Sequence, residues 1–223
     1  MWRGSALLAL ALMLTAGPAA ARDFTVHRLD SGVPGPTLLV VGGIQGDEPG
    51  GFNAAALLVT RYRITRGSVW VVPNLNFESI LRRSRGVHGD MNRKFANLPP
   101  SDPQYEAVQR VKALIRDEEV DAVLNLHDGS GFYRRHHIDE LQSPWRWGQS
   151  VIVDQAHMDA PLFGDLESVA ADVAARANMH IPDNDHFYAV KNTHTGQGNA
   201  EMARTLTWYA VRHGKPAFGV EAS

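Results

Sequence analysis

The sequence predicts an α/β fold with a mixed, largely parallel central sheet and helices on both faces. Two observations predict this fold: short apolar runs of strand length alternate along the chain with segments of helical apolar spacing, and hydrophobic residues make up 44% of the 223 residues, enough for one sizeable core. No linker between these segments is long enough to divide them, so we expect one domain.

The N-terminus has the composition of a signal peptide. Arg3 supplies a positive charge, residues 6–16 form an apolar run, and residues 19–21 are alanines that suit cleavage. The run is interrupted by a Gly-Pro pair, and a membrane-spanning helix needs roughly 20 apolar residues. An uncleaved N-terminal helix is the alternative. We expect a signal peptide at residues 1–21, a folded domain at residues 22–223, and a periplasmic or secreted protein with no stable membrane anchor after cleavage.

Charge and cysteine content narrow the choice of partners. Lys and Arg number 22 against 24 Asp and Glu, and no basic stripe is interleaved with aromatic residues, so a nucleic acid is not an expected partner. The chain contains no cysteine, which rules out disulfides even in an oxidising compartment.

The elements follow from the apolar pattern. Strands are predicted at residues 37–41, 68–73, 122–126 and 215–220, and helices at residues 50–63, 102–117, 165–178 and 199–212. In the second helix, Asp102 is a plausible cap and Pro103 occupies the first helical position. The polar and aromatic segment 129–149 has no period and predicts a long functional loop.

Four polar side chains fall just past the ends of predicted strands, namely Gln45, Glu48, His127 and Glu221. In open α/β sheets, functional sites gather outside the carboxyl ends of the strands. We therefore expect these four side chains to lie close together.

The residues around these positions carry a family resemblance. The sequence GGIQGDEPG, with Gln45 and Glu48, resembles the strand-end loop of the zinc metallocarboxypeptidase superfamily, whose pattern is His-x-x-Glu. NLHD around His127 resembles its second His ligand, and FGVE ending in Glu221 resembles its catalytic Glu. DMNR at residues 90–93 resembles the Asn-Arg pair that binds the terminal carboxylate of the substrate. These elements occur in family order over residues 37–223.

Gln in place of the first His narrows the resemblance to the murein D,L-carboxypeptidases that set helical or curved cell shape. The resemblance implies a zinc carboxypeptidase-like catalytic domain that releases meso-diaminopimelate from the peptidoglycan stem tripeptide L-Ala-γ-D-Glu-meso-diaminopimelate. It implies one Zn²⁺ per chain. The implied site comprises Gln45, Glu48 and His127 as metal ligands, Glu221 and Arg85 as catalytic residues, and Asn92, Arg93, Trp147 and Thr207 as substrate-binding residues.

Elementary chemistry agrees with the implied metal site. A catalytic zinc takes three protein ligands and keeps one open position. Gln45 would bind through its side-chain oxygen, a weaker donor than imidazole, so we expect looser zinc binding. Because Gln45 is neutral, as His is, the charge of the site is unchanged and we expect activity to be kept. The alternative is that Gln45 marks an inactive site. The apolar neighbours of Glu221 predict a raised pKa for its carboxyl group.

The roles of the other polar and aromatic residues near these motifs are inferred from their residue type and position. Among the nearby arginines, Arg85 and Arg93 are selected for a carboxylate or an oxyanion, with Arg82 and Arg83 as structural residues. Asp90 either orients an arginine or caps a turn. Asp128 is expected to support the site rather than bind metal. Trp145, Trp147 and Tyr133 either line a pocket or anchor the loop, and His88, His136, His137, His180, His186 and His194 are expected to be uninvolved.

Two other functions remain open. One is a zinc amidohydrolase of the aspartoacylase and succinylglutamate desuccinylase type, which shares the Gly-rich loop but is usually cytosolic. The other is a catalytically inactive homologue that binds peptidoglycan. The sequence stops two residues after Glu221, where the family continues with a closing helix, so we expect a fragment or a chain without its last elements. The oligomeric state is not predicted.

Overall fold

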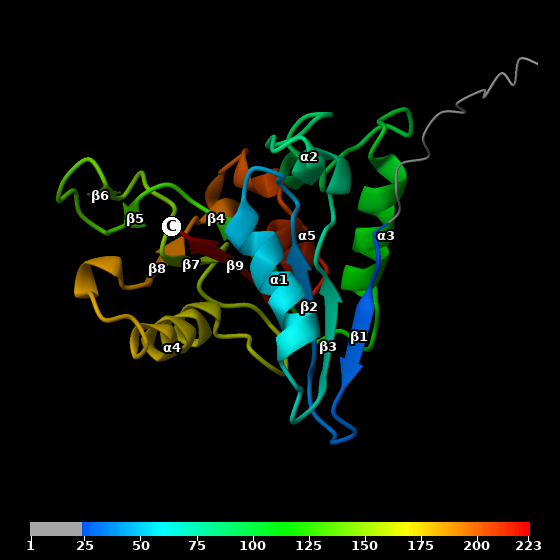
Figure 1. The fold of residues 1–223 in the computed structure, drawn as a ribbon, viewed down its shortest axis with the longest axis horizontal. Coiled ribbons are helices and arrows are strands. Elements are labelled where there is room, and N and C mark those ends of the chain that lie inside the picture. The colour runs from blue at the N-terminus through cyan, green and yellow to red at the C-terminus, as the bar shows by residue number, and fades with distance from the viewer. Residues whose placement is uncertain (1–23) are drawn as a thin grey trace, which may run out of the picture.

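The computed structural model describes residues 24–223, and the expected signal peptide at residues 1–21 lies outside them. In this part of the chain, seven strands form one sheet in the order β1-β3-β2-β4-β9-β7-β8 (Figure 1). A separate two-stranded sheet, formed by β5 (Phe132–Tyr133) and β6 (Gln142–Ser143), lies in the segment predicted as a long loop.

The large sheet is mostly parallel. Its strands are β1 (His27–Asp30), β2 (Thr37–Gly42), β3 (Ser68–Val72), β4 (Ala122–Asp128), β7 (Ser150–Val153), β8 (Ala189–Asn192) and β9 (Ala217–Ala222). Four of its six neighbouring pairs are parallel, and β1 with β3 and β7 with β9 are antiparallel. The predicted fold class is confirmed.

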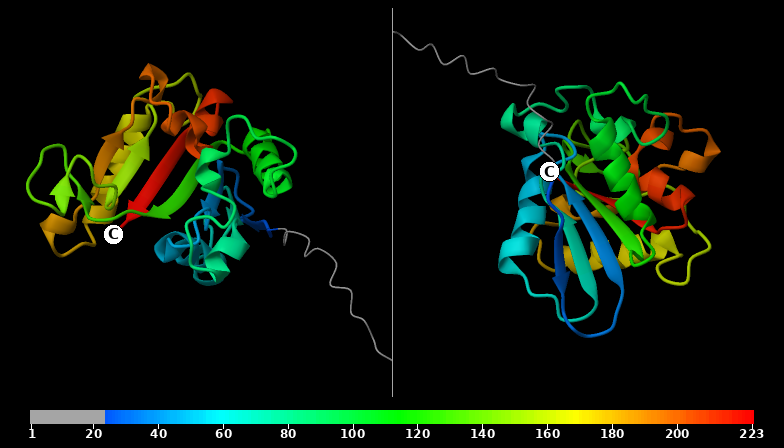
Figure 2. Two further views of the ribbon diagram at one scale, coloured as in Figure 1. Left: turned by 90° about the horizontal axis from the view of Figure 1, so that it is seen from above. Right: turned by 90° about the vertical axis from the view of Figure 1, so that its right-hand side faces the viewer.

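Helices cover both faces of the sheet. The helices are α1 (Pro49–Arg61), α2 (Phe77–Leu81), α3 (Tyr105–Arg116), α4 (Leu166–Asn178) and α5 (Leu206–Arg212), with short 3-10 helices η1 (Met91–Arg93), η2 (Asn184–His186), η3 (Thr195–Gln197) and η4 (Met202–Arg204). Leu124 and Leu126 pack on the α1 side, whereas Val123 packs in the cluster that contains α3 and α5. Figure 2 shows α1 and α3 on opposite sides of the sheet. The helix α4 packs against β7 and β8.

Two predicted helices begin later than expected. The first, α3, begins at Tyr105, because Asp102 accepts a hydrogen bond from the Gln104 amide at 2.8 Å and pairs with Lys94 at 2.7 Å. The second, α5, begins at Leu206 rather than at residue 199. Thr205 has extended backbone there and its hydroxyl caps the helix.

The strands that carry His127 and Glu221 are longer than predicted. Because β4 ends at Asp128 and β9 at Ala222, both side chains lie within their strands rather than beyond them. Parallel pairing places His127 beside Glu221, and antiparallel pairing places Glu221 beside Ser150, at the start of β7. The ends of β4 and β9 and the start of β7 therefore meet at one edge of the sheet.

The strands β1, β7 and β8 were not predicted. Each is four residues long, which leaves little room for an apolar pattern. In residues 24–223, no helix is long and apolar enough to cross a membrane.

Candidate functional site

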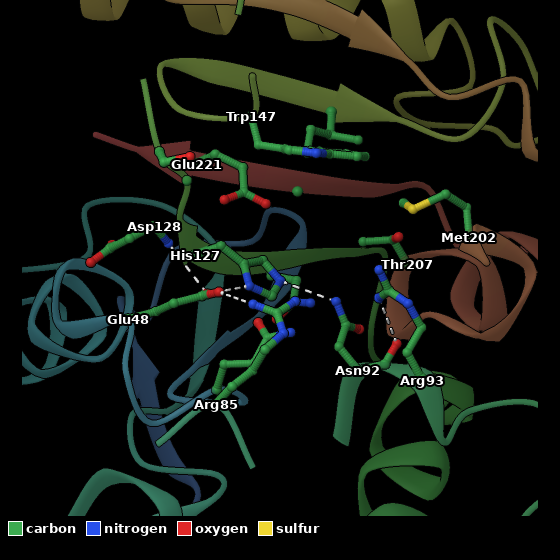
Figure 3. A pocket seen from close by; sticks show the side chains of 16 residues that line it. Glu48, Arg85, Asn92, Arg93, His127, Asp128, Trp147, Met202, Thr207 and Glu221 are labelled. Carbon is green, nitrogen blue, oxygen red and sulfur yellow. Dashed lines mark hydrogen bonds and ion pairs between the residues drawn. The ribbon is translucent and has the colours of Figure 1, made fainter. Parts of the chain in front are cut away.

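A cavity of about 270 Å³ opens where these strand ends meet (Figure 3). All nine side chains proposed from the sequence line it, namely Gln45, Glu48, Arg85, Asn92, Arg93, His127, Trp147, Thr207 and Glu221. The cavity also includes residues that were not assigned to the site: Asn125, Asp128, Gly129, Ser130, Ile152, Met202 and Gly219. The sequence therefore predicted which residues converge, but not the full lining.

The side chain of Gln45 is almost wholly buried and held in one orientation. Its Nε2 donates to Asp90 Oδ1 at 2.9 Å. Its Oε1 is buried and has no hydrogen-bond partner among residues 24–223. Leaving a buried acceptor unpaired costs about 1–3 kcal/mol. An amide whose nitrogen is anchored and whose oxygen is free is suited to bind a cation through that oxygen.

Glu48 and His127 meet beside this amide. Glu48 Oε2 lies 2.7 Å from His127 Nδ1, and both side chains are buried. Burial disfavours the charged imidazole, but the carboxylates of Glu221 and Glu48 outweigh it and raise the pKa of His127. The surroundings thus favour positive charge at this point.

These three side chains fit a divalent metal ion. They offer an amide oxygen, a carboxylate and an imidazole nitrogen, which are known donors for zinc and related metals. No group of three or more His, Cys, Asp or Glu side chains in residues 24–223 could hold a metal by itself. A cation site in this cavity would therefore draw on a donor of another type, and the unpaired amide oxygen of Gln45 is a candidate.

Arg85 is held beside the possible cation site by two carboxylates. Its guanidinium pairs with Glu48 Oε1 and with Asp90 Oδ2, each at 3.0 Å. Asp90 also accepts the Asn92 backbone amide at 2.9 Å, which caps η1. Both roles considered for Asp90 occur together. Arg82, in contrast, forms an exposed pair with Glu78.

Asn92 and Arg93 connect this network to the start of α5. Asn92 Oδ1 accepts the Leu206 amide at 3.0 Å, and its Nδ2 lies 3.4 Å from His127 Nε2. The Arg93 guanidinium pairs with Glu201 at 3.2 Å. The two side chains thus lie between the imidazole and the helix that carries Thr207 (Figure 3).

Glu221 points into the cavity towards His127 (Figure 3). Burial raises the pKa of its carboxyl group to about 7; His127 opposes this rise and Glu48 reinforces it. A carboxyl group with this pKa can both accept and release a proton near neutral pH.

The remaining wall comes from the long loop. Trp147 lines the cavity, and Lys191 fastens its segment by donating to the carbonyls of Pro144 at 2.8 Å and Arg146 at 3.1 Å. The Lys191 ammonium lies 4.3 Å from the ring centres of both Tyr133 and Trp147. Burial lowers the pKa of Lys191 to about 8. Trp145 is 75% exposed and does not line this cavity.

Two further expectations concern residues near the site. Asp128 accepts the backbone amides of Gly50 at 2.7 Å and Gly51 at 3.0 Å, so it holds the start of α1. The histidines expected to be uninvolved, His88, His136, His137, His180, His186 and His194, do not line the cavity.

Asn125 is one of the polar lining residues that were not predicted, because it lies in an apolar stretch of the sequence. It lies two positions before His127 on β4, and alternate residues of a strand face the same side. This two-residue spacing was the available signal. It is easily overlooked because Asn125 lies inside an otherwise apolar strand.

The chain with this cavity is similar to known proteins. A family model described as the catalytic region of a carboxypeptidase controlling helical cell shape matches residues 16–223. Tripeptide-bound cell shape determinant Csd4 from Helicobacter pylori is 42% identical, with a TM-score of 0.86 over 90% of this chain and 50% of that chain. Its mDAP-bound form, described as a D,L-carboxypeptidase, is 47% identical, with a TM-score of 0.82 over 84% of this chain and 45% of that chain.

A more distant likeness is limited to the fold. Succinylglutamate desuccinylase/aspartoacylase from Rhodobacter sphaeroides is 21% identical, with a TM-score of 0.56 over 89% of this chain and 50% of that chain. A search among curated proteins found no match. The chain spans about half the length of these solved structures.

Proposed function

The chain belongs to the family of carboxypeptidases that control helical cell shape, and we propose that it hydrolyses the C-terminal residue from a peptidoglycan stem tripeptide in the periplasm. The released residue would be meso-diaminopimelate. The observation that carries this proposal is the convergence of an unpaired amide oxygen, a carboxylate–imidazole pair and a buried acid in one cavity. Csd4, solved with a tripeptide and with mDAP bound, supports the substrate class.

Gln45, Glu48 and His127 are the proposed ligands of one zinc ion. Their combined formal charge of −1 would leave the site at +1 with Zn²⁺ bound. When bound, the ion would polarise a carbonyl group and lower the pKa of water. The hydrogen bond from Gln45 Nε2 to Asp90 leaves the amide oxygen without a partner among residues 24–223, which supports its assignment as a ligand.

Glu221 is the proposed general acid and base. Its buried carboxylate would take a proton from the attacking water and return it to the leaving amine. A pKa of about 7 suits both transfers, because the group is neither too weak a base nor too weak an acid near neutral pH.

The arginines are the proposed anion-binding groups. Arg93, with the amide of Asn92, would bind the terminal carboxylate of the peptide, because a planar guanidinium pairs well with a carboxylate. Arg85, held by Glu48 and Asp90, would stabilise the negative charge that develops on the scissile carbonyl oxygen.

Digestion of the purified tripeptide L-Ala-γ-D-Glu-meso-diaminopimelate, followed by mass spectrometry, tests this function. We expect release of meso-diaminopimelate, loss of release with a chelator, and recovery with added zinc. An N-acyl amino acid in parallel tests the amidohydrolase alternative. An intact tripeptide with metal-loaded protein would contradict the proposal, and cleavage of only the acyl amino acid would favour the alternative.

A further inference from the structure

Asp154 is a fully buried acid that the proposed mechanism does not use. It follows β7 directly, its exposed fraction is 0%, and it does not line the cavity. No Lys, Arg or His side chain of residues 24–223 pairs with it. Removing a carboxylate from water without a compensating cation is costly, so burial raises the pKa of Asp154 and favours its neutral form.

Asp102 shows how this protein holds an acid that serves the fold. Its carboxylate lies 2.7 Å from Lys94 Nζ and accepts the Gln104 amide at 2.8 Å. Burial opposes ionisation there too, but the hydrogen bond from Lys94 helps to lower the pKa of Asp102. Among residues 24–223, the carboxyl group of Asp154 has neither a cation nor a backbone amide as its partner. Its role therefore differs from the anchoring role of Asp102.

Three threonine hydroxyl groups act on the carboxyl group of Asp154 instead. Its Oδ1 accepts from Thr195 Oγ1 at 2.6 Å and from Thr193 Oγ1 at 3.2 Å. The third hydroxyl, that of Thr207, lies close enough to lower the pKa of the group, although burial outweighs it. Oδ2 is buried and has no hydrogen-bond partner in residues 24–223. Because Oδ1 already accepts two hydroxyl groups, the proton of the neutral acid belongs on Oδ2.

Thr207 connects this buried acid with the cavity. It lies in the first turn of α5 and lines the cavity (Figure 3). Its Oγ1 is 3.2 Å from Thr205 Oγ1, but Thr205 donates its own hydrogen to the Met202 carbonyl at 2.8 Å. A hydroxyl group has one hydrogen, so Thr205 cannot also donate to Thr207. Of these two neighbours, only a protonated Asp154 can donate a hydrogen bond to Thr207.

The direction of this hydrogen bond decides what Thr207 offers to the cavity. If Thr207 accepts a hydrogen bond from Asp154, its own hydrogen remains free for an acceptor in the cavity. An ionised Asp154 would do the opposite, because it would take the Thr207 hydrogen and leave a lone pair towards the cavity. The carbonyl and carboxylate oxygens of a peptide are acceptors, so the neutral acid is the form that suits a peptide.

We infer that Asp154 is a positioning residue that, as a neutral acid, donates a hydrogen bond to Thr207 and so directs the Thr207 hydroxyl hydrogen to an oxygen of the bound peptide. Asp154 itself touches no substrate. The inference rests on the proposed function, because it presumes that a peptide binds in this cavity.

Steady-state kinetics with L-Ala-γ-D-Glu-meso-diaminopimelate test this role. Asp154→Val removes the donor, so KM should rise about tenfold while kcat changes by less than about threefold. Asp154→Asn keeps a neutral donor and acceptor pair of the same shape, so its KM should stay within about threefold of the wild type. An unchanged KM in Asp154→Val, or an equal rise in both variants, would overturn the inference.

A double-mutant cycle shows whether Asp154 acts through Thr207. Thr207→Val should also raise KM about tenfold, and adding Asp154→Val to it should raise KM little further. A rise of about 100-fold in the double variant would mean that the two residues act separately and would overturn the inference. Thr193→Val is the matched control, because it removes a hydroxyl group from the same acid outside the cavity. Its KM should match that of the wild type.

Infrared difference spectroscopy provides a readout that does not depend on activity. The spectrum of the wild type minus that of Asp154→Asn, at neutral pH, should contain the C=O stretch of a protonated carboxyl group. Carboxylate bands in its place would overturn the inference. If Asp154→Val fails to fold, this spectrum and the KM of Asp154→Asn decide the outcome. If the wild type cleaves no tripeptide, the proposed function fails, whereas the spectrum still tests the proton on Asp154.

Discussion

At the cation end of the cavity, formed by Gln45, Glu48, His127 and Arg85, nearly every polar group is paired within the protein, whereas at the inner end Asn125 has no partner among residues 24–223. The first arrangement holds the side chains in place before a substrate binds, as a preorganised catalytic site requires. The second leaves a buried amide that no described residue holds. The difference teaches that the groups assigned to the chemistry are fixed in advance by their neighbours, whereas the deeper amide is not.

The largest expected effect concerns Glu221, which points towards His127 of the cation end (Figure 3). Glu221→Gln keeps the shape of the side chain but cannot exchange the proton, so kcat for the tripeptide should fall by about 10³-fold. Zinc content, measured by mass spectrometry of the metal, should stay unchanged. If turnover survives in this variant, another residue is the base and Glu221 is not a catalytic residue.

The metal site itself provides the next test. Gln45→His replaces an amide oxygen with imidazole, a stronger donor, so zinc should bind at least about tenfold tighter. Competition with a chromophoric chelator would measure this affinity, with Gln149→His as a control outside the cavity. An unchanged affinity would mean that residue 45 does not bind the metal.

The loop wall is expected to serve binding more than chemistry. Lys191→Met removes the ammonium that holds the carbonyls of Pro144 and Arg146, so KM should rise by about tenfold while kcat changes by less than about threefold. The control is Lys112→Met, since this lysine is also buried, donates to the Ala96 carbonyl at 3.1 Å and lies 4.9 Å from the Tyr209 ring. A fall in kcat with unchanged KM would mean that this loop segment contributes to the chemical step rather than to substrate binding.

The smallest effect concerns stability against pH in the metal-free protein. The pKa of Glu221 is raised from an ordinary 4.5 to about 7, so the folded protein binds more protons than the unfolded chain between these values. Stability should therefore fall as pH rises through this window. In Glu221→Gln this slope should be flatter, with a gain on the order of 1 kcal/mol near pH 7.

Denaturant unfolding at about pH 5 and pH 7.5 would measure this difference. His127, whose pKa is raised in part by the Glu221 carboxylate, contributes a slope of the same sign, and this contribution should also shrink in the variant. Parallel profiles for the two proteins would show that burial of Glu221 costs nothing at neutral pH.

Much of the site could be predicted because its residues occupy positions with a local signature. The end of an apolar strand marks where a parallel sheet presents side chains, so the order of residues alone was enough to group Gln45, His127 and Glu221. Asn125 had no such mark, because a polar residue within a buried strand can equally be paired by a distant segment. Only the tertiary contacts exclude that pairing among residues 24–223.

The sequence by itself determined the α/β class, the main strands and helices, and the grouping of Gln45, Glu48, His127 and Glu221, because apolar periodicity and strand ends are local properties. The other side chains proposed for the site came from the family resemblance of the sequence. The tertiary structure decided the reversed direction of β7 relative to β9, the fastening of Trp147 by Lys191, and the unpaired amide of Asn125. These features depend on contacts between segments far apart in the chain, which no local pattern encodes.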